Sequence, residues 1–132
     1  MITEDFVSFE IAKLLKENGF DEPCYQGYSK NELLPIAGWN NSGLDSFENG
    51  IIKIAAPTIQ MAMKWLRKVH NLHCAVDYDF VLGWYCQITS LKETVEYDYE
   101  EMKHYHPDKD NGFSTPEEAC EVAIKYCLEN LI

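Results

Sequence analysis

Acidic side chains recur at every second position in two segments that alternate between apolar and polar residues. Residues 73–80 carry two such carboxylates, and residues 94–100 carry three. Residues 84–89 alternate in the same way, and alternate residues of a β-strand point to the same side of a sheet. We therefore predict a sheet with one apolar face and one acidic face. The candidate partner-binding residues of this acidic face are Asp77, Asp79, Tyr85, Gln87, Glu96, Asp98 and Glu100.

An acidic face of this kind is suited to binding a basic protein. Neighbouring carboxylates on adjacent strands repel each other by roughly a few tenths of a kcal/mol per pair, a cost that a purely structural surface does not need. The alternative is a solvated sheet face, kept polar for solubility and to prevent association at the sheet edge. Acid–base catalysis would require a cleft that shifts the pKa values of these carboxylates, and an exposed face offers none. We therefore expect no enzyme activity.

Histidine and cysteine spacing suggests zinc as the most specific metal hypothesis. His70, His73 and Cys74 lie close together, and His104 and His106 follow at strand-like spacing. The first three span a predicted helix end and strand start, and the strand pattern directs Cys74 to the core and away from His73. These ligands do not converge, so we predict no metal site.

Other motifs that bind ions or nucleotides are missing from the sequence. The segment 108–112 (Asp-Lys-Asp-Asn-Gly) resembles a calcium loop, but no alignment places both a glycine at position 6 and a glutamate at position 12. There is no P-loop, dinucleotide-binding or nucleophile-elbow pattern. We predict no cofactor.

The cysteines indicate a reducing compartment. Their number is odd, no two form a Cys-x-x-Cys motif, and each falls within an apolar pattern; they are Cys24, Cys74, Cys86, Cys120 and Cys127. Such cysteines are typically small buried hydrophobic residues. We therefore predict a cytoplasmic protein, consistent with acids at positions 4 and 5 where a signal peptide would be basic.

Composition predicts one folded domain over residues 1–132. The chain is 46% hydrophobic and 13% aromatic, and its net charge is −11. This charge disfavours nucleic acids and anionic membranes, which are bound through Lys and Arg. No apolar run approaches the roughly 18 residues that span a bilayer.

Three regions follow along the chain: a helix over 3–18, an irregular or β region over 22–55, and a helix-strand-strand-strand-helix unit over 57–131. The first helix begins at the N-cap Thr3 and stops at Asn18-Gly19. Segments 24–28 and 33–37 form a hairpin, 38–43 a loop and 51–54 a short strand. Pro57 opens the next helix at its first position. The core stripe of that helix comprises Ile59, Ala62, Met63, Leu66 and Val69.

The strand patterns also predict a register. A three-residue hairpin with Gly83 at positive φ places Asp79 opposite Tyr85 and Tyr78 opposite Cys86. The third strand pairs Ile88 with Tyr97 and Gln87 with Asp98, 102–112 is a loop, and a capping box at 115–118 opens the last helix. The predicted fold is α+β, with a three- to four-stranded antiparallel sheet and two to three helices packed on one face.

The same order of elements occurs in double-stranded-RNA-binding domains, but the last helix here carries Glu117, Glu118 and Glu121, which oppose phosphate binding.

The chain resembles short uncharacterised proteins of gut bacteria and their phages and mobile elements. The resemblance lies in three stretches: 12–20, 55–67 with Ala-Pro-Thr and Lys-Trp-Leu-Arg, and 117–128. That group has no assigned activity, so the resemblance implies a cytoplasmic accessory protein and no catalytic residue.

Two functions follow. The first is a non-enzymatic accessory protein that binds a basic protein through its acidic face. The alternative is a structural, self-assembling protein, in which exposed aromatics such as Tyr85 or Trp39 and the wide apolar arc of the last helix form a homodimer. The predicted oligomeric state is therefore a monomer or a homodimer.

Overall fold

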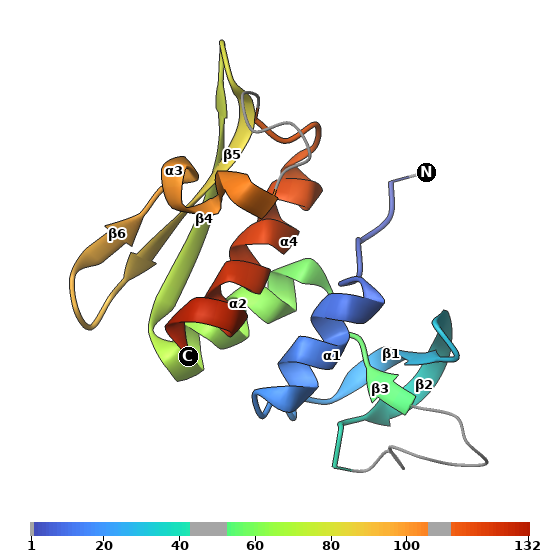
Figure 1. Ribbon diagram of the computed structural model, residues 1–132. Coiled ribbons are helices and arrows are strands. Elements are labelled where there is room, and N and C mark those ends of the chain that lie inside the picture. Colours follow the sequence, from blue (N-terminus) through green and yellow to red (C-terminus); the bar gives the residue numbers. More distant parts are fainter. Residues whose placement is uncertain (1, 43–52, 106–111) are drawn as a thin grey trace. The chain divides into compact units, whose positions relative to one another are not determined.

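The computed structural model describes residues 2–42, 53–105 and 112–132. The chain divides into two compact units, Met1–Met61 and Ala62–Ile132. Each unit contains a three-stranded antiparallel sheet accompanied by helices (Figure 1), which confirms the predicted α+β fold. Gly43, residues 51 and 52 of the predicted strand, His106 and residues 108–111 of the calcium-like loop lie outside the described residues. In the ranges that the structure describes, no helix has the length and apolar character needed to cross a membrane.

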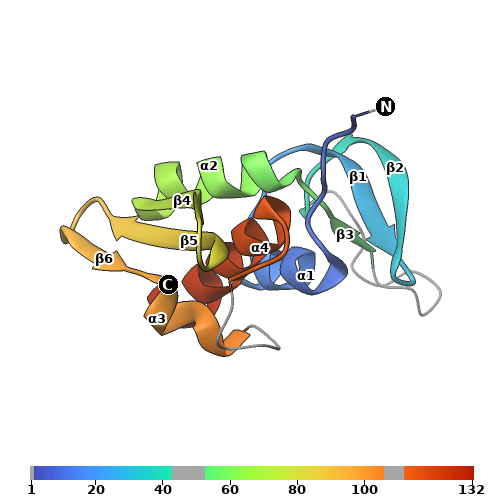
Figure 2. The same ribbon diagram turned by 90° about the horizontal axis from the view of Figure 1, so that it is seen from above.

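The first unit consists of a helix and a small sheet. Its elements are α1 (Phe9–Glu17), β1 (Cys24–Ser29), β2 (Glu32–Trp39) and β3 (Lys53–Ala55). The strand order is β2-β1-β3, and α1 lies beside β3 (Figure 2). The buried side chains of Ile11, Leu15, Phe20 and Ile54 form the core of this unit.

The first helix begins at Ser8, so the predicted start at Thr3 is wrong. The Ser8 side chain accepts a hydrogen bond from the Ile11 N–H at 3.3 Å. Residues 5–7 are instead extended, because they pair with residues 57–59 through the Val7 N–H to the Pro57 oxygen (3.1 Å). The predicted stop is confirmed, since Gly19 adopts φ +90° after the C-cap Asn18.

The predicted hairpin of the first unit is confirmed as β1–β2. Its two turn residues, Lys30 and Asn31, both have positive φ (52° and 65°), which is the backbone of a type I′ turn. Strand β2 extends to Trp39, so Gly38 and Trp39 belong to the sheet and not to the predicted loop. The Tyr25 ring lies over Gly38, where a Cβ would come within 3.1 Å of it.

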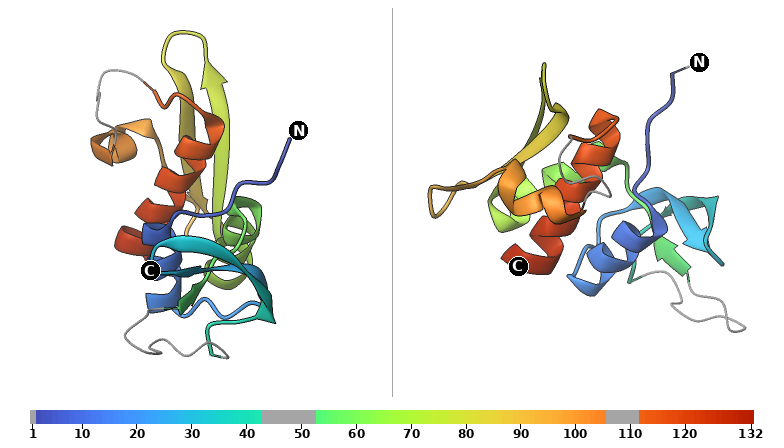
Figure 3. Two further views of the ribbon diagram at one scale, coloured as in Figure 1. Left: turned by 90° about the vertical axis from the view of Figure 1, so that its right-hand side faces the viewer. Right: turned by 45° about the horizontal axis from the view of Figure 1, so that its top comes forward.

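The second unit follows the predicted helix-strand-strand-strand-helix order. Its elements are α2 (Ile59–His70, beginning in the first unit), β4 (Leu72–Asp79), β5 (Gly83–Ser90), β6 (Val95–Tyr97), α3 (Tyr99–Met102), the 3₁₀ turn η1 (Lys103–Tyr105), α4 (Pro116–Tyr126) and the π-helical turn η2 (Cys127–Leu131). The strand order is β4-β5-β6, and α4 packs against β4 and β5 (Figure 3).

Helix α2 differs from its prediction at its start and in its core stripe. Thr58 is its cap, because the Thr58 hydroxyl accepts a hydrogen bond from the Met61 N–H at 3.1 Å, and Pro57 therefore lies one residue before the cap. Val69 is 54% exposed and does not belong to the core stripe. Trp65 is buried in its place, and its ring meets His70 edge-on at 4.8 Å.

The register of the second sheet is partly as predicted. Ile88 lies opposite Tyr97, as expected, but Asp77 and not Asp79 lies opposite Tyr85. The three-residue loop 80–82 is closed by the pair Asp79 and Gly83, which shifts the first hairpin by two residues. A two-residue shift keeps each side chain on its predicted face.

The last helix begins as predicted. Thr115 accepts a hydrogen bond from the Glu118 N–H at 3.1 Å, and Pro116 occupies the first helical position. Met102, which the sequence placed in a loop, is a buried residue of α3. The side chains buried between α4 and the sheet include Cys74, Cys86, Ile88, Ala119, Ala123 and Ile124.

Candidate interaction surface

Five of the seven predicted residues lie on one face of the second sheet. Asp77 and Tyr85 are directly opposite each other on β4 and β5, Gln87 follows two residues along β5, and Asp79 ends β4 two residues after Asp77. Glu96 lies opposite Thr89 on β6. These residues alternate with the buried Cys86 and Ile88, so they occupy the outer face, away from α4.

Two carboxylates of the outer face, Asp77 and Glu96, are widely separated. Asp77 and Glu96 are both exposed, but their opposite residues, Tyr85 and Thr89, are four positions apart along β5. At about 3.3 Å per residue this corresponds to roughly 13 Å. That separation exceeds the Debye length of about 8 Å at physiological salt, so the two charges act almost independently.

Asp79 caps the hairpin turn. Its Oδ1 accepts hydrogen bonds from the N–H groups of Val81 (2.8 Å) and Leu82 (2.9 Å). These bonds lower the pKa of Asp79 from its ordinary value, and the bond from the Leu82 N–H is the larger cause. The carboxylate therefore has a local structural role.

Asp98 and Glu100 do not lie on the sheet, because β6 ends at Tyr97. Asp98 caps α3: its Oδ1 accepts from the Glu100 N–H at 2.9 Å, while Glu101 accepts from the Asp98 N–H at 2.8 Å. The hydrogen bond with the Glu101 side chain, followed by that from the Glu100 N–H, lowers the pKa of Asp98. Glu100 forms an ion pair with Lys103 at 2.7 Å. The structure therefore does not gather the five predicted carboxylates on one face.

The most exposed apolar side chains of this sheet lie where β4 turns into β5. Phe80 is 96% exposed, Val81 is 87% exposed and Tyr78 is 55% exposed. We call these three residues the hairpin tip. The hairpin extends beyond the end of α4 that is nearest to it (Figure 3, left), which leaves the tip uncovered within this unit.

Backbone hydrogen bonds hold the base of the tip. The Gly112 N–H donates to the Leu82 oxygen at 2.6 Å, and the Phe113 N–H donates to the Trp84 oxygen at 2.7 Å. Trp84 also meets Tyr78 edge-on at 5.2 Å. Together with the Asp79 cap, these contacts fix the loop that carries Phe80 and Val81.

The sequence contained one signal for the tip. A hairpin loop normally carries Gly, Asn, Asp or Ser, whereas this loop reads Phe-Val-Leu before Gly83. Three apolar residues in a loop are unusual for a surface that is only solvated. The prediction instead assigned Phe80 to the alternating strand.

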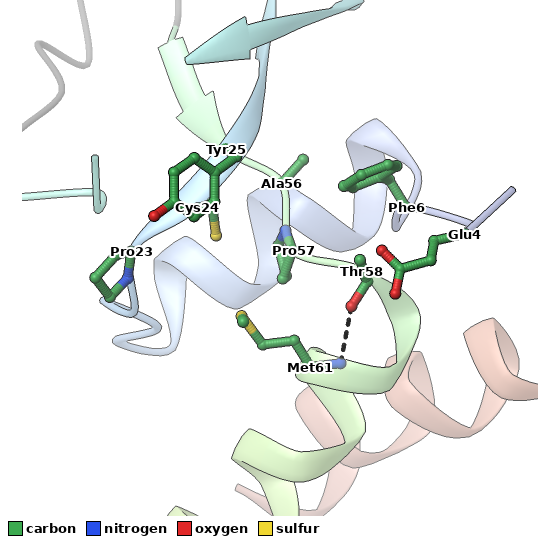
Figure 4. Close-up of a pocket in the computed structure, with 9 residues that line it drawn as sticks. All are labelled: Glu4, Phe6, Pro23, Cys24, Tyr25, Ala56, Pro57, Thr58 and Met61. Atoms are coloured by element: carbon green, nitrogen blue, oxygen red, sulfur yellow. Dashed lines mark hydrogen bonds between the residues drawn. The ribbon is translucent and has the colours of Figure 1, made fainter. Parts of the chain in front are cut away.

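A shallow pocket in the first unit is a second candidate (Figure 4). It has a volume of about 260 Å³ and is lined by Glu4, Phe6, Pro23, Cys24, Tyr25, Ala56, Pro57, Thr58 and Met61. The Thr58 hydroxyl is engaged by the Met61 N–H. Burial, followed by the nearby Glu22, raises the pKa of Cys24 to about 11, so its thiol is protonated at neutral pH and is a poor nucleophile. The lining offers no catalytic pair.

The residues whose spacing resembles that of zinc ligands occupy different elements of the second unit. His70 ends α2 against Trp65, His73 alternates with Cys74 on β4, and Cys74 is buried in the core. In the part of the chain that is described, no three His, Cys, Asp or Glu side chains are grouped to hold a metal ion.

Comparison with protein-family models, curated proteins and solved structures found no match to this chain.

Proposed function

We propose that the protein is a non-enzymatic accessory module that binds a basic protein through the hairpin tip and the adjoining outer face of the second sheet. The observation that carries this proposal is the exposure of Phe80 (96%) and Val81 (87%) in a hairpin loop. The resemblance to small proteins of gut bacteria and mobile elements supports a cytoplasmic setting, and the net charge of −11 disfavours nucleic acid or a membrane as partner.

The tip is preorganised for binding. Asp79 caps the loop from one side, and the Gly112 N–H bonds it from the other. A loop already fixed in one conformation loses little entropy when a partner binds, which preserves binding free energy. Protein interfaces commonly combine such an apolar anchor with a polar rim.

Charge supports a basic partner. The chain carries a net charge of −11, and Asp77 precedes the tip directly on β4. A negative protein attracts a positive surface at long range and raises the association rate, an effect that salt weakens. The partner is therefore expected to present an apolar pocket bordered by Lys or Arg.

Affinity capture with matched variants tests this function. Tagged protein is incubated with bacterial lysate at low and high salt, and the bound proteins are identified by mass spectrometry. Phe80→Ser combined with Val81→Ser should remove a specific basic protein at both salt concentrations. Leu91→Ser, at another exposed apolar position beyond β5, is the control and should leave capture unchanged. Equal capture by all three proteins would refute the proposal.

Self-assembly is the alternative function, and the first unit provides its supporting observation. Strand β2 lies at a sheet edge and carries the half-exposed Trp39, and an edge strand can pair with a second copy. Pro35 within β2 lacks an N–H and so weakens such pairing. Size-exclusion chromatography with light scattering separates the two functions, because a dimer that persists at high salt and is lost in Trp39→Ser supports self-assembly.

A further inference from the structure

Four of the five cysteines lie in the core of the second unit. Cys74 is on β4, Cys86 is on β5, and Cys120 and Cys127 lie in α4 and at the start of η2; all four are buried. The sulfur atoms of Cys74 and Cys127 are 3.8 Å apart. The Cys86 sulfur is 3.4 Å from the sulfur of Met102.

Strand and helix periodicity explains why these cysteines meet. Val76 lies opposite Cys86, so Cys74, two residues earlier on β4, shares a face with Cys86. Cys120 and Cys127 are seven residues apart, or about two helical turns, which places them on the same side of the helix. Because α4 packs on β4 and β5, its cysteines face those of the sheet.

We propose that Cys74 and Cys127 form an oxidisable pair that hydroperoxides convert into a disulfide between β4 and η2. One thiolate attacks a peroxide oxygen, so the O–O bond breaks, a sulfenic acid forms and one water is released after protonation. The second thiolate then attacks that sulfur, the S–S bond forms and the S–O bond breaks, which releases a second water after protonation. In total, two thiols lose two electrons and two protons, and one hydrogen peroxide becomes two waters.

The two sulfur atoms of the pair must move only a short distance to form a bond. A disulfide bond is about 2.05 Å long, so the two sulfur atoms must approach by roughly 1.7 Å. The segment that moves is η2, because this π-helical turn at the end of α4 departs from regular helical hydrogen bonding.

Access for the oxidant also depends on η2. The hydrogen bond between the two thiols, followed by burial, raises the pKa of Cys127, so the closed pair holds its protons. The reaction therefore proceeds through local opening of η2. The Tyr105 hydroxyl holds this turn: it accepts a hydrogen bond from Asn130 Nδ2 (3.1 Å) and donates one to Glu129 Oε2 (2.9 Å).

Cys24 provides a matched control within the same chain. It is buried in the first unit, and burial raises its pKa to about 11. The first unit contains no second cysteine, so Cys24 has no thiol partner within its unit. It therefore reports oxidation of a buried cysteine without a pairing sulfur.

The test oxidises the native full-length protein with excess hydrogen peroxide, alkylates it in denaturant and maps the peptides by mass spectrometry. We expect one disulfide, Cys74–Cys127, with an intact-mass loss of about 2 Da that dithiothreitol reverses, while Cys24 is alkylated as a free thiol. Cys24→Ala should form the same disulfide, and Cys127→Ala should not lose this mass. If Cys127→Ala does not fold, Cys120→Ala, which removes a neighbouring thiol outside the pair, should still form the disulfide. Oxidation of Cys24 at the same rate as the pair, a different pairing, or no mass loss would overturn the proposal.

Discussion

Asn41 joins two segments of the first unit, and its replacement should have a large effect on stability. Its Nδ2 donates to the Phe20 oxygen at 2.8 Å, and its Oδ1 accepts from the Ala55 N–H at 2.9 Å. The side chain thereby connects the segment that follows α1 to β3. Asn41 is only 8% exposed, and both partner residues are buried.

Asn41→Ala should lower the free energy of unfolding by about 2–4 kcal/mol. The alanine removes both hydrogen bonds and leaves the buried Ala55 N–H without this acceptor; a lost hydrogen bond costs about 0.5–1.5 kcal/mol and an unsatisfied buried group roughly 1–3 kcal/mol. Urea unfolding followed by far-UV circular dichroism measures the loss as a lower midpoint, with the slope compared to detect separate transitions of the two units.

Two further variants sharpen the test. Asn40→Ala is the control, because Asn40 binds the Ser42 hydroxyl at an exposed position (2.8 Å), and we expect it to cost less than about 1 kcal/mol. Asn41→Asp keeps the acceptor for Ala55 but places a carboxylate beside the Phe20 oxygen, so its stability should increase as the pH falls and the carboxyl gains a proton to donate. A loss in Asn41→Ala equal to that of the control would refute the reasoning.

Three other predictions concern the second unit. Asp79→Ala should lower the free energy of unfolding at neutral pH. Because the folded pKa of Asp79 is below its ordinary value of 3.8, the stability difference between variant and wild type should disappear as the pH falls below 3.8 and through the folded pKa. A stability difference that persists at pH 2 in chemical unfolding would contradict this prediction. Gly112→Ala should lower Tm by several degrees, since the new Cβ would lie 2.6 Å from the Trp84 backbone oxygen; an unchanged Tm in calorimetry would disprove this clash. Tyr105→Phe removes the hydroxyl that holds η2, so alkylation of Cys127 in native buffer should accelerate several-fold, and an unchanged rate would separate this contact from access to the thiol.

Periodicity predicted the faces of the second sheet, because side-chain alternation depends on the strand alone. Cys86 and Ile88 are buried, and Asp77 points outward, as the alternation requires. The register depends on where the turn closes. Asp79 closes it by binding two N–H groups, and the apolar sequence of the loop did not indicate that position.

The candidate site was harder to predict, because two local patterns compete after β6. Alternation continues through Asp98 to Glu100, which suggested a longer strand. Asp98 and Glu101 also have the spacing of a capping box, the motif that correctly identified the start of α4, and the structure uses it. The structural role of Asn41 could not be predicted from the sequence, because its hydrogen-bond partners at residues 20 and 55 are distant in the chain.

The local contacts of the acidic residues also limit how many of their carboxylates a partner could bind. The carboxylates of Asp79 and Asp98 are bound to backbone N–H groups, and Glu100 is paired with Lys103, so these three have local partners. Asp77 and Glu96 keep exposed carboxylates on the outer face, roughly 13 Å apart along the sheet. Backbone N–H groups do not neutralise a carboxylate, so a partner that binds through the tip and the outer face meets three ionised acids, Asp77, Asp79 and Glu96, and not five. Its affinity should fall only modestly with salt, because apolar contacts with Phe80 and Val81 provide most of the binding free energy.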